Sequence, residues 1–364
     1  MVSDWKHVRL GDICIIERGA SPRPIDKYIT ASKDGVNWIK IGDTDDSMYI
    51  TSTAQKITVE GAKKSRYVQV GDFILSNSMS FGRPYILRID GCIHDGWLLL
   101  RDTANVFDKK FLYYYLSSPS TYFKFKMLAV GGVVNNLNSQ MVRELNVLVP
   151  PREEQHKIVK TLDKVMDLIE KRKKQIEKLD ELIKSRFIEM FGDSVSEQVN
   201  WKILPWTLIV DIKNGKNQRA VECVNGEFPI YGSGGIMGYA NHYICNENSV
   251  VIGRKGNINK PILVRTKFWN IDTAFGLEPK QQITVEYLYY FCVFYDFEKL
   301  NKTVTIPSLT KKDLLNVEMP VPPIELQNKF AEFVEMVEKN KSAIKKSLSS
   351  LETLKKSLMQ KYFG

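Results

Sequence analysis

The sequence lacks the residue patterns that mark metal sites and disulfide frameworks. Its five cysteines are odd in number and widely scattered, and no two of them have C-x-x-C spacing. Its four histidines are also scattered, and none has the spacing of metal ligands. These absences argue against a structural zinc site and against a set of disulfides.

Patterns for nucleotide binding and catalysis are missing too. The chain has no G-x-x-x-x-G-K-[ST] loop, which argues against ATP hydrolysis. Gly-rich residues 232–238 lack G-x-G-x-x-G spacing and precede no helical pattern, so they fit a tight hairpin close to a ligand better than a cofactor loop. The two Val-Pro-Pro sequences lack the flanking residues of an amino-methyltransferase active site. We therefore expect no catalytic site, metal or cofactor in this chain.

A signal peptide and an apolar run long enough to cross a bilayer are also absent, so we expect a cytoplasmic protein with reduced thiols. Lys and Arg number 52 against 42 Asp and Glu, which gives a net charge of +10. This charge favours an acidic partner, nucleic acid first and a membrane surface second, with simple solubility as the alternative. The 364 residues, 43% of them hydrophobic, suffice for two or three folded domains.

What the sequence does contain is an internal repeat. Residues 149–155 (VPPREEQ) return as residues 321–327 (VPPIELQ), and each copy opens a helical pattern that ends in Phe-Gly. The shift is constant from end to end (322 − 150 = 172 and 364 − 192 = 172). Because a repeat dictates architecture, we expect a pseudo-two-fold molecule with two helices of equal length, at 150–192 and 321–364.

Both expected helices carry apolar residues at heptad spacing, which predicts that they pair in an antiparallel coiled coil within the chain. A long coiled coil between two chains is the alternative. Lys341 and Lys355 interrupt the second copy and suggest a wetter layer there. The expected seam residues are Ile158, Leu162, Val165, Ile169, Ile176, Leu179, Ile183, Phe330, Val334, Val337, Ile344, Leu348 and Leu351.

The segments before the two helices, residues 1–149 and 196–320, have short β-branched and aromatic runs cut by Gly, Pro and Asn. They predict two mixed α+β globules, each with one helix near its end, at Lys109–Leu116 and Val285–Phe294. Weaker similarities link the globules at shifts that vary from 196 to 177, so their loops differ in length while the helices do not. Kept frameworks and varied loops are typical of two readers on one scaffold.

Side chains suited to reading DNA lie in loops of both globules. Arg and Lys match guanine edges or phosphates, and Asn and Gln match adenine edges. Surface solvation is the alternative for each one. The paired tyrosines 113–114 and 289–290 fit helix packing better than base stacking. The DNA-binding candidates are Arg23, Lys40, Ser76, Asn77, Ser78, Arg83, Asn135, Asn136, Lys216, Asn217, Gln218, Arg219, Ser233, Arg254, Lys255, Asn257 and Lys260.

Taken together, the motifs resemble those of the DNA-specificity subunit of type I restriction-modification systems. The resemblance rests first on Pro-Pro-x-x-x-Gln at 150–155 and 322–327, each leading into a heptad helix that ends in Phe-Gly. Shorter matches spread it over the chain: Trp5…Leu10-Gly11-Asp12-Ile13…Gly19, Gly71-Asp72, Asn135-Asn136-Leu137, Tyr231-Gly232-Ser233-Gly234-Gly235, Gly253-Arg254-Lys255-Gly256-Asn257 and Asp272-Thr273-Ala274-Phe275.

The resemblance implies that each globule is a target-recognition domain for one half of a bipartite, asymmetric site in double-stranded DNA. It implies that the paired helices set the spacing and dock two adenine-N6 methyltransferase subunits. S-adenosylmethionine, ATP and Mg would then belong to the methyltransferase and to separate restriction subunits that translocate and cleave DNA. The alternative is a non-catalytic dimeric scaffold that binds no specific DNA sequence.

Overall fold

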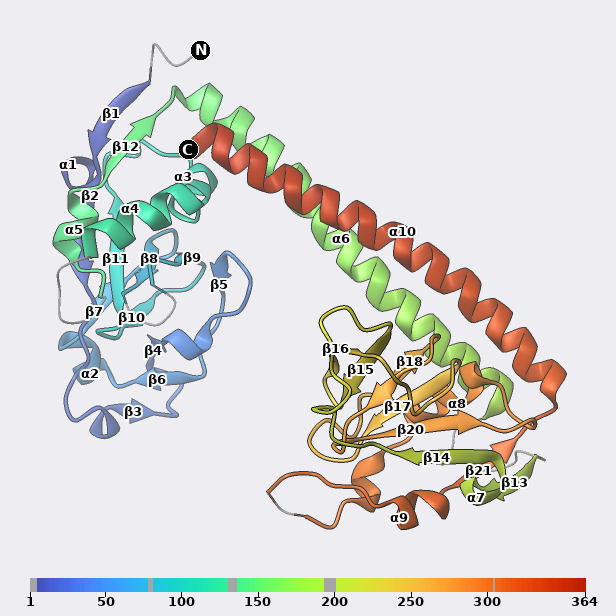
Figure 1. Ribbon diagram of the computed structural model, residues 1–364. Coiled ribbons are helices and arrows are strands. Elements are labelled where there is room, and N and C mark those ends of the chain that lie inside the picture. The colour runs from blue at the N-terminus through green and yellow to red at the C-terminus, as the bar shows by residue number, and fades with distance from the viewer. Residues whose placement is uncertain (1–4, 78–80, 130–135, 193–200, 304) are drawn as a thin grey trace. The chain divides into compact units, whose positions relative to one another are not determined.

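The computed structural model describes residues 5–77, 81–129, 136–192, 201–303 and 305–364 (Figure 1). The chain forms two compact units: unit 1 comprises 1–172 and 347–364, and unit 2 comprises 173–346. Two 40-residue helices, α6 (Arg152–Phe191) and α10 (Ile324–Phe363), each contribute one half to each unit. Each unit therefore has a globule with its own sheets and the two helix halves that pack on it.

Unit 1 has two five-stranded sheets within the described residues. The first, in the order β2-β11-β8-β9-β5, contains β2 (Cys14–Arg18), β11 (Trp97–Asp102), β8 (Phe73–Ser76), β9 (Pro84–Leu87) and β5 (Tyr49–Ile50). The second, in the order β3-β6-β4-β10-β7, contains β3 (Ile29–Thr30), β6 (Gln55–Ile57), β4 (Val36–Ile39), β10 (Gly91–Ile93) and β7 (Arg66–Val68). β8 and β9 are buried along their whole length, as a strand covered on both faces must be.

Helices and one further strand pair complete unit 1. β1 (Lys6–Arg9) pairs antiparallel with β12 (Asn146–Val149), the strand that leads into α6. The helices are α1 (Leu10–Ile13), α2 (Val59–Lys63), α3 (Lys109–Leu116), α4 (Pro119–Ala129) and α5 (Ser139–Arg143), with 3-10 turns at Ile25–Lys27 and Ile41–Asp43.

Unit 2 has the same plan, with fewer strands among its described residues. Its four-stranded sheet, in the order β14-β20-β17-β18, contains β14 (Val210–Asn214), β20 (Ala274–Pro279), β17 (Ser249–Gly253) and β18 (Ile262–Val264). Its second sheet, in the order β16-β15-β19, contains β16 (Gly235–Ala240), β15 (Phe228–Gly232) and β19 (Trp269–Asn270). The remaining elements are β13 (Lys202–Pro205), β21 (Glu318–Val321), α7 (Trp206–Ile209), α8 (Val285–Phe294), α9 (Lys311–Leu315) and a 3-10 turn at Phe297–Leu300.

The strand register is repeated between the units residue for residue. The three central strands are offset by 177 (250 − 73 = 177 and 274 − 97 = 177), and the first strand is offset by 196 (210 − 14 = 196). A slip of one residue would turn every side chain to the opposite face, so a shared register means a shared core. The matching pairs are Cys14–Asp102 with Val210–Pro279, Trp97–Ser76 with Ala274–Gly253, Phe73–Ile86 with Val250–Leu263, and Lys6–Val149 with Lys202–Val321.

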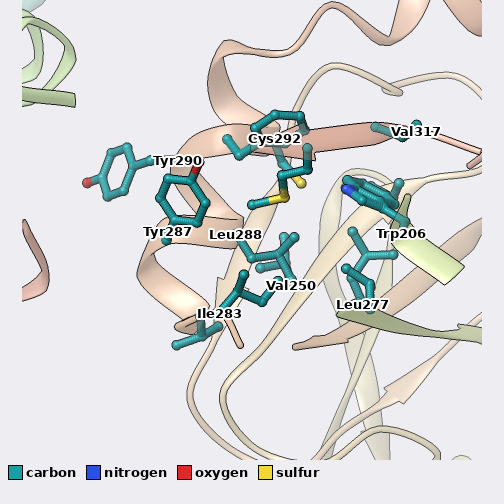
Figure 2. Close-up of a cluster of buried hydrophobic side chains, with 14 of the residues drawn as sticks. Trp206, Val250, Leu277, Ile283, Tyr287, Leu288, Tyr290, Cys292 and Val317 are labelled. Atoms are coloured by element: carbon teal, nitrogen blue, oxygen red, sulfur yellow. The ribbon is translucent and has the colours of Figure 1, made fainter. Parts of the chain in front are cut away.

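Each half of a long helix is part of the core of its unit. In unit 2 the last turns of α6 and the first turns of α10 share one cluster of buried side chains with α8 and the large sheet. Figure 2 shows part of this cluster, where Leu288 of α8 lies beside Val250, with Tyr287 on one side and Leu277 and Trp206 on the other. In unit 1 the first turns of α6 and the last turns of α10 join α3 in the same way. The helices α6 and α10 therefore pack with each other inside each core.

Most of the expected seam residues are covered. Eight are buried: Ile158, Leu162, Val165, Ile169, Ile183, Phe330, Val334 and Val337. Five are half-buried: Ile176, Leu179, Ile344, Leu348 and Leu351. Lys341, expected in a wet layer, is instead largely covered and pairs with Asp180 and with Glu338 at 3.1 Å. Burial alone would lower the pKa of Lys341, but the hydrogen bonds to the two carboxylates outweigh it and raise the pKa.

Candidate nucleic-acid interface

Three segments of unit 2 meet around the loop that follows β17. The N–H of Arg254 donates to the carbonyl of Thr273 at 2.8 Å, which joins this loop to the segment before β20. The N–H of Gly256 donates to the carbonyl of Pro307 at 2.9 Å, and the N–H of Leu309 donates to the carbonyl of Arg254 at 2.9 Å. Main-chain hydrogen bonds thus hold the loop in place, so its position does not depend on its polar side chains.

The Gly-rich stretch is a β-hairpin, as expected, and its turn lies against the same loop. Ser233 and Gly234 form the turn between the paired residues Gly232 and Gly235. A Cβ added to Gly253 would come within 3.1 Å of the Ser233 Cβ, and one added to Gly256 would lie 4.0 Å from its Oγ. The sequence candidates Ser233, Arg254, Lys255 and Asn257 are therefore brought together by the fold.

The second group of candidates in unit 2, residues 216–219, lies beside the same part of the fold. Gly215 is needed there because a Cβ would lie 1.7 Å from the carbonyl oxygen of Ile271. The N–H of Lys216 donates to the carbonyl of Asn270 at 3.0 Å, and the carbonyl of Lys216 accepts from the indole N–H of Trp269 at 2.9 Å. Both candidate loops are therefore bonded to the single segment 269–273.

The cations of these loops are exposed and lack carboxylate partners. Lys216, Arg219, Arg254, Lys255 and Lys260 all lie on the surface. Among the residues the structure describes, the ion pairs of unit 2 are made by other cations. Unpaired, clustered positive charge suits phosphate oxygens, which a protein contacts through Arg, Lys and backbone N–H groups.

In unit 1 two candidates line a cleft of about 890 Å³. Arg23 and Lys40 share it with Trp38, Gln55 and Asp95 among others. The Nζ of Lys40 donates to the Oε1 of Gln55 at 2.8 Å, and an Nη of Arg23 lies 3.4 Å from a carboxylate oxygen of Asp95. Unlike the cations of the unit 2 loops, Arg23 already has a carboxylate partner.

The cleft also contains polar residues that are absent from the sequence candidates. Ser21 Oγ donates to the carboxylate of Asp95 at 2.8 Å, and this hydrogen bond is the largest cause of a lowered Asp95 pKa. Burial lowers the pKa of His94, whose Nδ1 accepts from the N–H of Gly96 at 2.7 Å. The sequence could have indicated Asp95, because Asp95 and Asp272 are equivalent at the 177-residue offset. Nothing comparable in the sequence indicated Ser21 or His94.

The other unit 1 candidates have different surroundings. Ser76 and Asn77 are buried, and the Asn77 amide donates to the carbonyl of Asp95 at 2.8 Å. Arg83 donates to the Asp45 carbonyl at 2.9 Å, while Asn136 is exposed. In unit 2, Asn217 and Asn257 are exposed and Gln218 is half-buried. Ser78 and Asn135 lie outside the described residues.

None of the helices among the described residues is long and apolar enough to cross a membrane. None of the His, Cys, Asp and Glu side chains of these residues form a group that could hold a metal ion. Their cysteines are all free thiols.

The repeated frame with clustered polar loops corresponds to a known family. The family model described as "Type I restriction modification DNA specificity domain" matches residues 2–179 and again residues 198–353. The chain belongs to this family. The two matches fall on the two copies of the repeat, so each unit carries one specificity domain.

Relatives in this family are similar over nearly their whole length. The MjaVIII specificity subunit of a type I restriction enzyme from Methanocaldococcus jannaschii is 22% identical over 403 residues, covering 98% of this chain and 91% of that protein. The MjaIX specificity subunit from the same organism is 22% identical over 375 residues, covering 91% and 86%.

Solved structures show the same fold. A chain from a study of assembly and conformational transition of a type I restriction-modification system aligns with a TM-score of 0.65 at 18% identity, covering 99% of this chain and 97% of the other. The specificity subunit from Mycoplasma genitalium, solved by crystallography, aligns with a TM-score of 0.58 at 19% identity, covering 99% and 96%. At these identities the likeness concerns the fold alone.

Proposed function

We propose that this chain is the sequence-specific DNA-binding subunit of a type I restriction-modification complex. Its two globules, residues 1–149 and 196–320, each read one half of a bipartite, asymmetric site. The repeated strand register carries this proposal, because it gives two equal frames whose loops differ in length and sequence. Two frames with different loops suit two different half-sites.

The loops around Arg254 and Lys216 contact DNA from unit 2, and the cleft around Arg23 and Lys40 does so from unit 1. The unit 1 candidates Asn77 and Ser76 are buried, and Asn77 holds the carbonyl of Asp95, a residue that lines the unit 1 cleft. Phosphate contacts by the unpaired cations make the affinity depend on salt. Half-sites about one helical turn apart, or about 10–10.5 base pairs, would present the same groove face to both globules.

The helices α6 and α10 form an antiparallel coiled coil that sets the spacing of the half-sites and docks two adenine-N6 methyltransferase subunits. The buried apolar seam in each core supports this pairing. S-adenosylmethionine is used by the methyltransferase, and ATP with Mg by separate restriction subunits. The chain itself has no catalytic site in this scheme.

Mapping methylated adenines tests the whole proposal at once. DNA is exposed to this chain together with the methyltransferase of its own system, and modified adenines are located by sequencing. We expect one asymmetric sequence with two specified halves and an unspecified spacer of fixed length. Methylation without a bipartite sequence, or equal binding of specific and random duplexes, would favour a scaffold with no sequence preference.

A deletion tests the role of the helices separately. Removing residues 173–176 and 345–348 takes about one turn, or about 5–6 Å, from both helices. The spacer should then shorten by one or two base pairs at about 3.4 Å each. An unchanged spacer in an active complex would refute the idea that the helices measure it.

A further inference from the structure

Gln155 ends the first copy of the repeated proline motif, and its side chain ties three backbone segments together in unit 1. It is 1% exposed. Its Oε1 accepts the N–H of Asp108 at 2.7 Å, and its Nε2 donates to the carbonyls of Val106 at 3.1 Å and Pro150 at 3.0 Å. Three of the four hydrogen bonds that a glutamine amide can make are therefore used, all with main-chain atoms.

Gln327 repeats the arrangement in unit 2. It is 0% exposed. Its Oε1 accepts the N–H of Thr284 at 2.8 Å, and its Nε2 donates to the carbonyls of Gln282 at 3.0 Å and Pro322 at 2.8 Å. Asp108 and Thr284 are the N-cap residues of α3 and α8. In both units one side chain joins the first turn of a long helix, the proline turn before it and the start of the globule's own helix.

The chemistry of this position admits few other residues. The site presents two carbonyls and one N–H, so its occupant needs two donors and an acceptor on one planar group. Glutamate and methionine lack the donors, and asparagine is shorter by one methylene. Because the bonded atoms belong to the main chain, the glutamine fixes the path of the backbone between globule and helix without depending on neighbouring side chains.

The two units differ in what else holds globule and helix together. In unit 1 the Asp163 carboxylate of α6 accepts from Lys110 Nζ and from the Tyr114 hydroxyl of α3, both at 2.7 Å. In unit 2 the equivalent of Asp163, Glu335 (335 − 163 = 172), is exposed, and no described residue of α8 bonds to it. Unit 2 therefore lacks this polar attachment and has instead an aromatic cluster around Phe330. Because apolar packing is non-directional, the orientation of globule 2 depends more on the directed hydrogen bonds of Gln327.

We propose that Gln155 and Gln327 are positioning residues for spacer selectivity. Each holds its globule in one orientation on its own long helix, so that the complex accepts its two half-sites at a single separation. The inference rests on the proposed function, because it presumes a bipartite site. Loosening either junction allows the globule to reach a half-site displaced by a base pair, and loosening at Gln327 does so more.

The test uses Gln155→Met and Gln327→Met, which keep the length of the side chain and remove its hydrogen bonds. Each variant is assembled with the methyltransferase of its system and given duplexes that carry both mapped half-sites at the native spacer or at one base pair more or less. We expect methylation at the altered spacers to rise about tenfold relative to the native spacer for Gln327→Met, a change of about 1.4 kcal/mol in discrimination. The rise is smaller for Gln155→Met, and both variants keep the half-site sequences.

Two kinds of control separate positioning from stability. Gln140→Met and Gln281→Met make the same chemical change at exposed positions and should behave as wild type. Ile74→Val and Val251→Ala weaken the cores of units 1 and 2 in clusters that contain no residue of the long helices, and they should lower methylation at all spacers alike. If the glutamine variants follow the pattern of these core variants, with reduced methylation and an unchanged spacer preference, the positioning role is overturned. A wild-type complex that methylates no bipartite site would instead refute the proposed function.

Discussion

Unit 1 and unit 2 share one strand register, yet different side-chain contacts attach their globules to the long helices. In unit 1 the attachment includes an ion pair and a hydroxyl hydrogen bond, both made to Asp163. In unit 2 it includes an aromatic cluster, in which the ring centroid of Phe330 lies within 5.5 Å of those of Phe187, Phe191 and Tyr290. Both units therefore keep the junction between globule and helix, although the contacts that hold it differ.

The loops differ between the units in a related way. Position 77 of unit 1 and position 254 of unit 2 are equivalent (254 − 77 = 177), and each side chain donates to the carbonyl of the equivalent aspartate, Asp95 or Asp272. Asn77 is buried, whereas Arg254 is exposed and its Nη1 lies 3.4 Å from the Asp272 carbonyl oxygen. The same frame contact is thus made by a buried side chain in unit 1 and by an exposed cation in unit 2.

The largest expected effect comes from replacing one globule outright. Exchanging residues 1–149 for the matching part of a relative that reads another sequence should change one half of the methylated site. The other half and the spacer should stay the same, because unit 2 and the helices are untouched. Sequencing of methylated adenines provides the measurement, and a change in both halves would contradict the independence of the two units.

The aromatic junction predicts a strong difference between equivalent positions of the two helices. Phe330→Leu should destabilise unit 2 by about 2–4 kcal/mol, because three ring pairs worth about 0.5–1.5 kcal/mol each are lost. Ile158→Leu at the equivalent position (330 − 158 = 172) preserves volume and should cost less than about 1.5 kcal/mol. Denaturant unfolding followed by hydrogen exchange in α8 and α3 measures the stability losses of unit 2 and unit 1 separately. Equal losses would show that the rings contribute only by their volume.

Substitutions at the equivalent positions 254 and 77 compare the two units by their effects on DNA binding and on stability. Arg254→Ala should weaken specific binding by about 1–3 kcal/mol, since each good base contact by Arg is worth about that much. If the guanidinium contacts a phosphate instead, all sequences weaken and the salt slope falls by about 1. Asn77→Ala should lower the thermal stability of unit 1 more than it changes specificity, because the Asp95 carbonyl loses its donor. Binding titrations at several salt concentrations distinguish these results.

The smallest expected effect concerns the polar junction of unit 1. Asp163→Asn removes the partly exposed ion pair with Lys110, which is worth about 0.2–1 kcal/mol. Hydrogen exchange in α3 should accelerate slightly, and less so at high salt because the pair is screened. Glu335→Gln is the matched control in unit 2 and should leave α8 unchanged. A response of α8 equal to that of α3 would remove the distinction drawn between the junctions.

Much of the fold was predictable from local patterns. The expected helices at Lys109–Leu116 and Val285–Phe294 are α3 and α8 with the same bounds, and the expected long helices are α6 and α10. The expected packing of the paired tyrosines is confirmed, since Tyr114 and Tyr290 are buried. These predictions succeeded because apolar periodicity and Pro and Gly boundary signals are properties of contiguous sequence.

Parts that depend on distant residues were not predictable. Lys341 looked like a break in the apolar seam, but Asp180, 161 residues away, pairs with it. Ser76 and Asn77 looked like loop residues, yet they are buried where β8 meets β11 and Asp95. Nothing near Gln155 in the sequence indicates that its partners are Val106 and Asp108, because those bonds close only when the globule folds onto the helix.

The sequence by itself determined that the chain is a duplicated unit with two equal helices, because a constant 172-residue shift needs no structure to be seen. It also supplied candidates for DNA reading in the loops of both globules. Only the tertiary structure decided which of those candidates are exposed cations and which are buried. The physical reason is that burial and hydrogen-bond partners come from strands and turns brought together across long stretches of chain, while periodicity and composition are read along it.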